Sequence, residues 1–270
     1  MDLNKFIKEG KFLMLALDHR GSIKKLINPD NPDSVSDDQV IQLKSDIILS
    51  LADQFSGLLI DEVWGLEACK DVCDVKPFLL PVEKSGYIQD GEERLTELEY
   101  SVEQIMGMGA SGAKMLLYFN PNVSSAGKQL ETARIVLEDC RSNNFPLFLE
   151  IVTYGEVGGG DLILESVKKF LEVGIIPDVW KLEYPGSREE CNKITKLVGE
   201  VPWILLTGGQ TFEEFKPELE EAIAGGARGF LAGRALWQEV CRLSGEEKLK
   251  FLQKTLPERF KNISEVATKS

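Results

Sequence analysis

The stretch PDVWKLEYP, from Pro177 to Pro185, is a short run of large apolar side chains that two prolines bound. A run of this length that is rich in Val, Trp, Leu and Tyr predicts a β-strand buried on both faces. Such strands are typical of parallel sheets that helices cover. The stretch therefore predicts an α/β fold and places one lysine, Lys181, in its interior.

Lys181 is an unusual residue for a buried strand. Lysine is almost never fully buried unless it is paired, and burial disfavours its charged form. A neutral amine is a nucleophile toward carbonyls, so this position favours imine chemistry. An ion pair with Asp178 or Glu183 explains the lysine equally well from this strand alone. The other strands have to decide between the two interpretations.

Apolar runs of the same kind recur along the chain and alternate with helical patterns. The other predicted strands are residues 12–17, 57–63, 76–83, 112–118, 146–153, 202–207 and 229–232. The predicted helices include residues 39–54, 92–106, 124–143, 161–174, 188–198 and 212–224. Eight strand–helix units over about 250 residues predict a TIM (β/α)8 barrel, with residues 1–270 forming a single domain. A doubly wound open sheet is disfavoured because no G-x-G-x-x-G turn follows the first strand.

Composition excludes several classes of function. The formal net charge of −13, without a cluster of Lys and Arg, argues against nucleic-acid binding. No apolar stretch reaches the roughly 18 residues of a membrane span, and no signal-like run precedes a cleavage site. We therefore expect a cytoplasmic protein without a membrane partner. The outer helices show no pattern that fixes a subunit count, which leaves a homo-oligomer open.

Histidine and cysteine usage argues against a metal centre. His19 is the one histidine, whereas histidine-based metal catalysis normally needs two or three imidazoles. Imine formation then remains as the way to stabilise a carbanion, and we expect no metal and no other cofactor. The five cysteines are odd in number and scattered, which favours reduced thiols. Cys69 and Cys73 alone are a weak indication of a metal site.

Charged residues on the predicted strands supply a candidate active site. Asp18 ends the first strand, Lys114 and Glu150 lie in the fourth and fifth, and Lys181 lies in the sixth. Interior residues of neighbouring barrel strands converge on one cavity, where a second cation would lower the pKa of Lys181 and a carboxylate could carry protons. The structural alternative is an ion-paired plug, but buried pairs often fail to offset their desolvation.

Glycine-rich turns follow the last two strands. Thr207-Gly208-Gly209 and Gly233-Arg234 fall where TIM barrels commonly bind phosphate through backbone N–H groups and a helix N-terminus. Arg234 could add a forked, charge-assisted contact. Either turn alone could simply be tight, but both together with an arginine favour a phosphate site.

These residues carry a resemblance to a known family. The matching segments are LALDHRGSIKKL (15–26), LLIDEVWGLEA (58–68), LLPVEKSGY (79–87), GAKMLLYFNP (112–121), LFLEIVTY (147–154), DVWKLEYP (178–185), PWILLTGG (202–209) and GARGFLAGRALW (226–237). Taken in order, they resemble the tagatose-1,6-bisphosphate aldolase family, which also contains the sulfofructosephosphate aldolases.

The resemblance implies a metal-independent class I aldolase. Such an enzyme forms a Schiff base between a lysine and the ketone of a phosphorylated ketohexose, such as tagatose 1,6-bisphosphate or sulfofructose 1-phosphate. It then cleaves the C3–C4 bond to give dihydroxyacetone phosphate and glyceraldehyde 3-phosphate or sulfolactaldehyde. By the matching segments, Lys181 is the imine lysine, Glu150 the proton shuttle, and Asp18 and Lys114 assist. The glycine-rich turns and Arg234 match the phosphate grip.

The sequence departs from the family where the far end of the sugar would bind. It has DHRG at residues 18–21 where the family has DQRG, TGG at 207–209 where the family has SAG, and a shorter segment around 154–161. The distal group, whether phosphate, sulfonate or hydroxyl, therefore stays open. We expect His19 and Arg20 near it, with Lys24 and Lys84 as further candidates for holding a second anion. Two alternatives also remain: an isomerase or epimerase that forms no imine, and a catalytically idle binding barrel.

Overall fold

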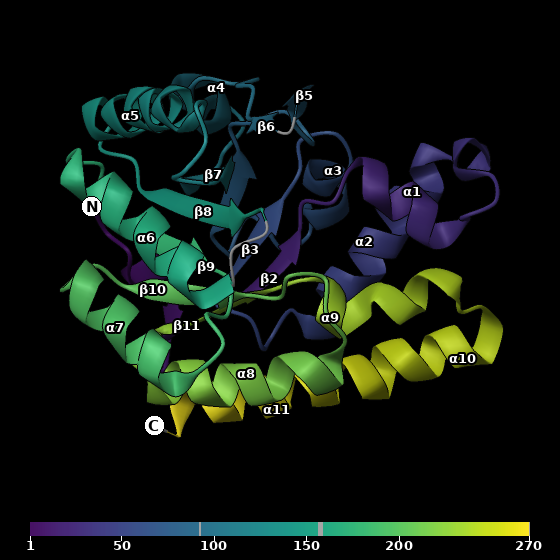
Figure 1. Ribbon diagram of the computed structural model, residues 1–270. Helices are drawn as coiled ribbons and strands as arrows, with labels where there is room; N and C mark the ends of the chain where they lie inside the picture. The colour runs from purple at the N-terminus through teal and green to yellow at the C-terminus, as the bar shows by residue number, and fades with distance from the viewer. Residues whose placement is uncertain (92, 156–158, 270) are drawn as a thin grey trace.

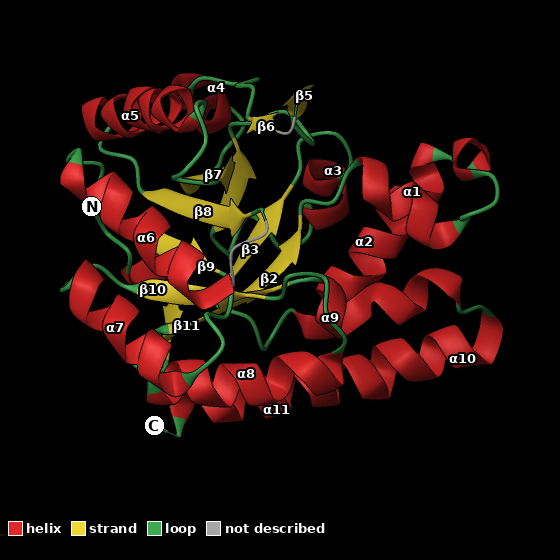
Figure 2. Ribbon diagram, viewed as in Figure 1, coloured by secondary structure: helices red, strands yellow, loops and turns green. Residues whose placement is uncertain are grey.

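A closed barrel of parallel strands forms the centre of the molecule. The computed structural model describes residues 1–91, 93–155 and 159–269. The barrel strands are β2 (Lys11–Leu17), β3 (Gly57–Ile60), β4 (Phe78–Pro81), β7 (Gly112–Phe119), β8 (Leu147–Thr153), β9 (Val179–Leu182), β10 (Trp203–Leu206) and β11 (Gly229–Ala232). Each strand pairs in parallel with the next, and β11 pairs with β2, which closes the ring. The predicted TIM barrel is therefore confirmed (Figure 2).

Helices surround the barrel (Figure 1). They are α1 (Gly21–Ile27), α2 (Asp37–Leu51), α3 (Gly65–Cys69), α4 (Val102–Gly107), α5 (Ala126–Ser142), α6 (Gly159–Glu172), α7 (Arg188–Val198), α8 (Phe212–Ala224), α9 (Arg234–Trp237), α10 (Gly245–Lys250) and α11 (Leu256–Thr268). The predicted helices 188–198 and 212–224 match α7 and α8 in full. Serine or threonine side chains accept a hydrogen bond at the N-termini of both helices. Because these residue types are preferred at that position, the sequence predicts correctly where each helix begins.

The interior of the barrel changes character along its axis. Side chains alternate along each strand, so every second residue points inward. The inward residues near the N-terminal ends of the strands form one apolar cluster: Phe12, Met14, Leu59, Leu79, Phe148, Val179, Ile204 and Leu231. Phe6, from the segment before β2, closes this end with its ring 5.2 Å from that of Phe148. Two residues further along the same inward face, Glu150 follows Phe148 and Lys181 follows Val179, so charged side chains replace apolar ones on these strands.

The predicted helix 92–106 is wrong in its first half. A hairpin of β5 (Ile88–Asp90) and β6 (Glu93–Leu95) occupies the start of this region, and α4 begins only at Val102. Ser101 fixes that start, because its hydroxyl accepts from the Gln104 N–H while the Gln104 side chain accepts from the Ser101 N–H. The hairpin lies beside β7 (Figure 1).

The expectation of reduced thiols is wrong for one pair. Cys69 and Cys73 form a disulfide at the end of α3. Residues four apart share one face of a helix, and the Cα–Cα distance of 5.5 Å lies within the usual disulfide range. Cys140, Cys191 and Cys241 are buried free thiols.

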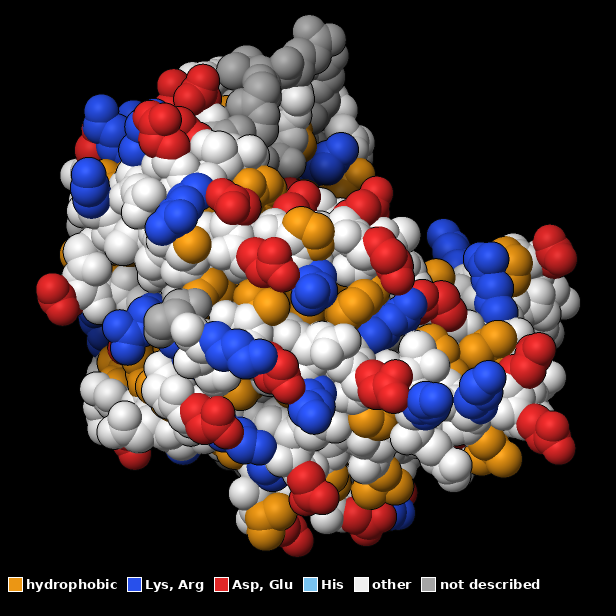
Figure 3. All heavy atoms as spheres, turned by 90° about the horizontal axis from the view of Figure 1, so that it is seen from below, with side chains coloured by type: hydrophobic (Ala, Val, Ile, Leu, Met, Phe, Trp, Pro, Cys, Tyr) orange, Lys and Arg blue, Asp and Glu red, His pale blue; other side chains and the backbone are white. Residues whose placement is uncertain are grey.

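The surface shows no strong segregation of charge on the face in Figure 3, where Lys and Arg side chains are interspersed with Asp and Glu. Among the described residues, no helix combines the length and the apolar character that crossing a membrane requires.

Candidate active site

A cavity of about 410 Å³ opens at the C-terminal ends of the barrel strands. This is the end where TIM-barrel enzymes place their catalytic groups. Of the predicted site residues, all but Lys24 and Lys84 line it: Asp18, His19, Arg20, Lys114, Glu150, Lys181, Thr207, Gly208, Gly209, Gly233 and Arg234. The fold therefore brings together residues that lie more than 200 positions apart in the sequence.

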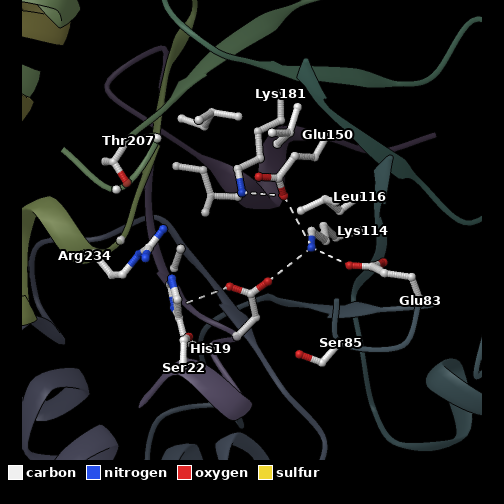
Figure 4. Close-up of a pocket in the computed structure, with 18 of the residues that line it drawn as sticks. His19, Ser22, Glu83, Ser85, Lys114, Leu116, Glu150, Lys181, Thr207 and Arg234 are labelled. Atoms are coloured by element: carbon white, nitrogen blue, oxygen red, sulfur yellow. Dashed lines mark hydrogen bonds and ion pairs between the residues drawn. The ribbon is translucent and has the colours of Figure 1, made fainter. Parts of the chain in front are cut away.

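Lys181 faces Glu150 across the β8–β9 pair. The two residues are direct neighbours in the strand register, and Lys181 Nζ donates to Glu150 Oε2 at 2.8 Å (Figure 4). Both residues are buried, with 5% and 6% of their surfaces exposed. The sequence-based alternative of an ion pair with Asp178 or Glu183 is wrong, because Asp178 accepts from the Leu147 N–H and Glu183 accepts from Thr153.

Lys114 is the centre of the charged cluster. Its Nζ lies 3.2 Å from Asp18 Oδ2 and 3.3 Å from Glu150 Oε2, and it also donates to Glu83 Oε1 (Figure 4). Burial by itself would lower the pKa of Lys114, but the carboxylates of Glu83, Glu150 and Asp18 outweigh burial and raise that pKa. Lys114 is therefore a permanent cation that shares one oxygen of Glu150 with Lys181.

The carboxylates in this cluster differ in how strongly they hold a proton. Burial favours the neutral form of each, but Lys181 and Lys114 lower the pKa of Glu150, and Lys114 together with His19 lowers that of Asp18. For Glu83, burial outweighs Lys114 and the pKa is raised. Glu83 Oε2 is buried and has no hydrogen-bond partner in the described part of the chain. The cluster thus combines two carboxylates that stay ionised with one carboxyl group that holds a proton more tightly.

Donor groups converge on the opposite side of the cavity. Gly209 has φ +83°, and a Cβ on it would lie 2.8 Å from Arg234 Nη2, so this turn requires glycine. Arg234 makes no ion pair with any carboxylate among residues 1–91, 93–155 and 159–269. Thr207 lines the cavity beside it (Figure 4). A free guanidinium next to a glycine-rich turn fits an anion.

The four residues predicted to bind a second anion at the far end of the sugar are less available for that role than Arg234 is for the first phosphate. Arg20 Nη1 lies 3.0 Å from both Glu62 and Glu99, and its Nη2 donates to the Glu83 carbonyl. Lys24 pairs with Asp37 and Lys84 pairs with Glu97, and neither lysine lines the cavity.

His19, the fourth of these residues, is neutral near pH 7. Burial and the nearby cations Arg234, Lys44 and Lys181 lower its pKa to about 4, although Asp18 acts in the opposite direction. Its ring packs edge-on against Trp237 with the centroids 5.1 Å apart.

Two parts of this region were not predicted from the sequence. Glu83 was placed at the end of a strand without a role, although a carboxylate at the C-terminal end of a barrel strand is itself a signal of a site residue. The second is a fully buried ion pair of Lys44 on α2 with Asp61 after β3. Lys44 Nζ also donates to the carbonyls of Leu17 and His19 at 2.8 and 3.1 Å, on either side of Asp18.

Known proteins resemble this chain over nearly its whole length. The tagatose 1,6-diphosphate aldolase 2 of Streptococcus pyogenes serotype M1 is 27% identical over 300 aligned residues, which cover 98% of this chain and 92% of that protein. The tagatose 1,6-diphosphate aldolase of Staphylococcus epidermidis is 27% identical over 301 residues, with 97% and 91% covered.

Solved structures share the fold. The crystal structure of an archaeal fructose 1,6-bisphosphate aldolase matches with a TM-score of 0.68 and 22% identity over 99% of both chains. An archaeal fructose-1,6-bisphosphate aldolase whose catalytic lysine is covalently bound to a carbinolamine intermediate matches with a TM-score of 0.66 and 22% identity, over 95% of this chain and 98% of that chain.

A family model agrees with these likenesses. The model described as DeoC/LacD family aldolase matches residues 12–239, which include every residue of the cavity and all of the barrel except the first residue of β2, Lys11. The chain therefore belongs to the DeoC/LacD family of aldolases.

Proposed function

We propose that this protein is a metal-independent class I aldolase that cleaves a phosphorylated ketohexose to dihydroxyacetone phosphate and an aldehyde. The observation that carries the proposal is the pairing of Lys181 with Glu150 in a cavity that has anion donors on one side. Lys181 makes one side-chain hydrogen bond in the described structure, so its amine can turn toward a bound ketone. The tagatose 1,6-diphosphate aldolases among its relatives support a ketose bisphosphate as the first substrate to try.

Lys181 acts as the nucleophile. Glu150 Oε2, 2.8 Å away, takes a proton from the ammonium group, and the neutral amine adds to the C2 carbonyl of the ketose. Loss of water from the resulting carbinolamine gives a protonated imine. Lys114 keeps Glu150 ionised before this step, since it lies 3.3 Å from the same oxygen.

The protonated imine then accepts the electrons of the breaking bond. Glu150 removes the proton of the C4 hydroxyl, the C3–C4 bond breaks, and the aldehyde leaves while the electron pair moves into an enamine on Lys181. Proton return to C3 and addition of water release dihydroxyacetone phosphate. Asp18 and Glu83, both bonded to Lys114, are placed to hold substrate hydroxyl groups.

The phosphate of the dihydroxyacetone half binds to the turns after β10 and β11. Thr207, Gly208, Gly209 and Gly233 offer hydroxyl and backbone donors there, and Arg234 adds a charge. This placement fixes the direction of the sugar chain across the cavity, with C2 next to Lys181.

A trapping experiment tests the proposal. The protein is incubated with dihydroxyacetone phosphate, reduced with borohydride and digested, and peptide masses locate any adduct. We expect an adduct on Lys181 and none in Lys181→Met. A folded wild-type protein that gives no adduct would contradict imine formation and would favour an isomerase or epimerase that uses Glu150 for proton transfer alone.

A further inference from the structure

The hairpin β5–β6 places an arginine among three tyrosine rings, one of which, Tyr118, lines the cavity. The guanidinium carbon of Arg94 lies 5.1 Å from the ring centroid of Tyr87, 5.6 Å from that of Tyr118 and 5.1 Å from that of Tyr154. Tyr87 and Tyr118 also pack edge-on, with their centroids 4.9 Å apart. We call Arg94 and these three tyrosines the Arg94 cage.

Hydrogen bonds to residues of the barrel and of α5 hold the Arg94 cage in place. The Gln129 side chain donates to the carbonyls of Arg94 and Tyr118, and the Thr96 hydroxyl donates to the Leu116 carbonyl. These bonds hold β6 against β7 near the C-terminal end of the strand. Arg94 is therefore held in position both by hydrogen bonds to its backbone and by the three tyrosine rings around its side chain.

The Arg94 cage borders the cavity on the side opposite the proposed phosphate turns. Tyr118 lines the cavity and continues the inward row of β7 that includes Lys114. In the ring of eight strands β7 lies across from β11, and Figure 4 shows Arg234 and Thr207 on one side and Lys114 with Glu83 on the other. A ketose that has one end at Arg234 and its ketone at Lys181 extends toward Tyr118.

The positive charge of Arg94 is not neutralised by a carboxylate among the described residues. In the described part of the chain it makes no ion pair and no side-chain hydrogen bond, whereas Arg20, Lys24 and Lys84 all contact carboxylates. Aromatic rings contact the faces of a guanidinium and leave its N–H groups free to donate at the edge. Phosphate and sulfonate oxygens are suited to such a forked donor.

Tyr118, which lines the cavity, adds a neutral hydroxyl donor. Burial, followed by the charge of Glu150, raises the pKa of Tyr118, so its phenol keeps its proton at neutral pH. A neutral hydroxyl beside a cation completes a site for a tetrahedral anion and avoids the repulsion that a carboxylate would cause.

We infer that the Arg94 cage binds the acidic group at the distal end of the substrate, a phosphate or a sulfonate carried by the aldehyde half. The inference rests on the proposed aldolase function, because that function sets the direction of the sugar. It replaces Arg20, Lys24 and Lys84 as the residues that hold a second anion.

Aldol addition provides the test, because the acceptor can be varied at one position. Dihydroxyacetone phosphate is added to glyceraldehyde 3-phosphate, sulfolactaldehyde or glyceraldehyde, which differ in a phosphate, a sulfonate or a hydroxyl. We expect Arg94→Met to lower kcat/KM for the two charged acceptors by about 10- to 100-fold, the size typical of losing a hydrogen bond to a charged group. The rate with glyceraldehyde should stay within about twofold, and Arg94→Lys should recover part of the loss.

Controls separate this inference from the proposed function. Trapping of dihydroxyacetone phosphate on Lys181 should be unchanged in Arg94→Met, since that half of the substrate does not reach the cage. Arg134→Met removes one charge from the outer helix α5, where Arg134 pairs with Glu131, and should not change acceptor preference. Absence of trapping in the wild type contradicts the aldolase itself.

Other outcomes bear on the Arg94 cage alone. If trapping persists but Arg94→Met slows all three acceptors equally, Arg94 only holds the hairpin and the inference is wrong. A loss confined to glyceraldehyde 3-phosphate supports a phosphate site, and a loss confined to sulfolactaldehyde supports a sulfonate site. A melting curve like that of the wild type shows that the variant is folded.

Discussion

Two buried lysines, Lys44 on α2 and Lys181 on β9, have surroundings that give them different roles. Lys44 Nζ contacts the Leu17 carbonyl, the His19 carbonyl and the Asp61 carboxylate, which match its three N–H groups. Lys181 has one such partner, Glu150, and lines a cavity. A buried lysine with every donor satisfied stabilises structure, whereas one with free donors and access to a ligand can react. Burial alone therefore does not identify a catalytic lysine.

The sharpest way to break this comparison is to remove each amine in turn. Lys181→Met should reduce aldol cleavage by about 10⁴-fold or more, because the covalent intermediate can no longer form. Its unfolding free energy should change little, since Glu150 still has Lys114 at 3.3 Å. Turnover assays and urea unfolding measure the two effects. Residual activity above about 1% of wild type would place the nucleophile elsewhere.

Lys44→Met should show the opposite pattern. It leaves the Asp61 carboxylate, which is 0% exposed, without its cation, and breaking a buried pair in this way typically costs about 3–5 kcal/mol of stability. Urea unfolding at pH 7 measures the loss. The double variant Lys44→Met/Asp61→Leu is the matched control, because removing both charges should restore part of the stability. A stable Lys44→Met protein would mean that the pair is dispensable.

Glu150→Gln tests the proton path while keeping the shape of the side chain. We expect kcat to fall by about 10²- to 10³-fold, the scale of losing a general acid–base group. Borohydride trapping on Lys181 should become slower without disappearing, since the amine remains. Equal rates for the variant and the wild type would assign proton transfer to Asp18 or Glu83.

The contrast between the two lysines also explains what the sequence could reveal. The sequence singles out Lys181 because this lysine interrupts an apolar run that forms a strand of four residues, Val179–Leu182. The barrel followed from the alternation of such runs with helices, and the convergence of Asp18, Lys114 and Glu150 followed from the barrel. Closing the sheet into a barrel brings these residues together, so their convergence can be predicted once the strand order is known.

The sequence does not single out Lys44, because a lysine in an amphipathic helix resembles a surface residue. Its spacing carried the missing signal: Lys44 follows Val40 by four residues and precedes Ile47 and Ile48, all on the buried face of α2. Arg94 was overlooked for another reason, since the charged segment 92–106 predicted a helix rather than a hairpin. The hairpin forms because of contacts with side chains that are distant in sequence, and the periodicity of the segment itself does not encode such contacts.

The smallest effect that we predict involves His19, which joins the two lysine sites. Its carbonyl accepts from Lys44, while its ring lies beside Asp18 in the cavity. Its folded-state pKa is lowered to about 4, below the ordinary value of about 6.5. Between these values the unfolded chain binds a proton that the native protein does not, so the free energy of unfolding falls as the pH drops through this window.

His19→Gln should remove that slope and keep the backbone carbonyl for Lys44. Urea unfolding of both proteins at pH 7, 6 and 5 measures it, and the chain has one histidine, so no second imidazole complicates the comparison. Below about pH 4 both proteins should lose stability together, because the unfolded chain then protonates Asp18 and Glu150 while the native protein, in which their pKa values are lowered, keeps them ionised. If both proteins instead become more stable, and by the same amount, as the pH falls from 7 to 5, the titrating group is Glu83 or Glu183, because a raised carboxyl pKa makes the native state bind the extra proton. The sign of the slope therefore distinguishes the His19 imidazole, whose pKa is lowered, from the carboxyl groups of Glu83 and Glu183, whose pKa values are raised.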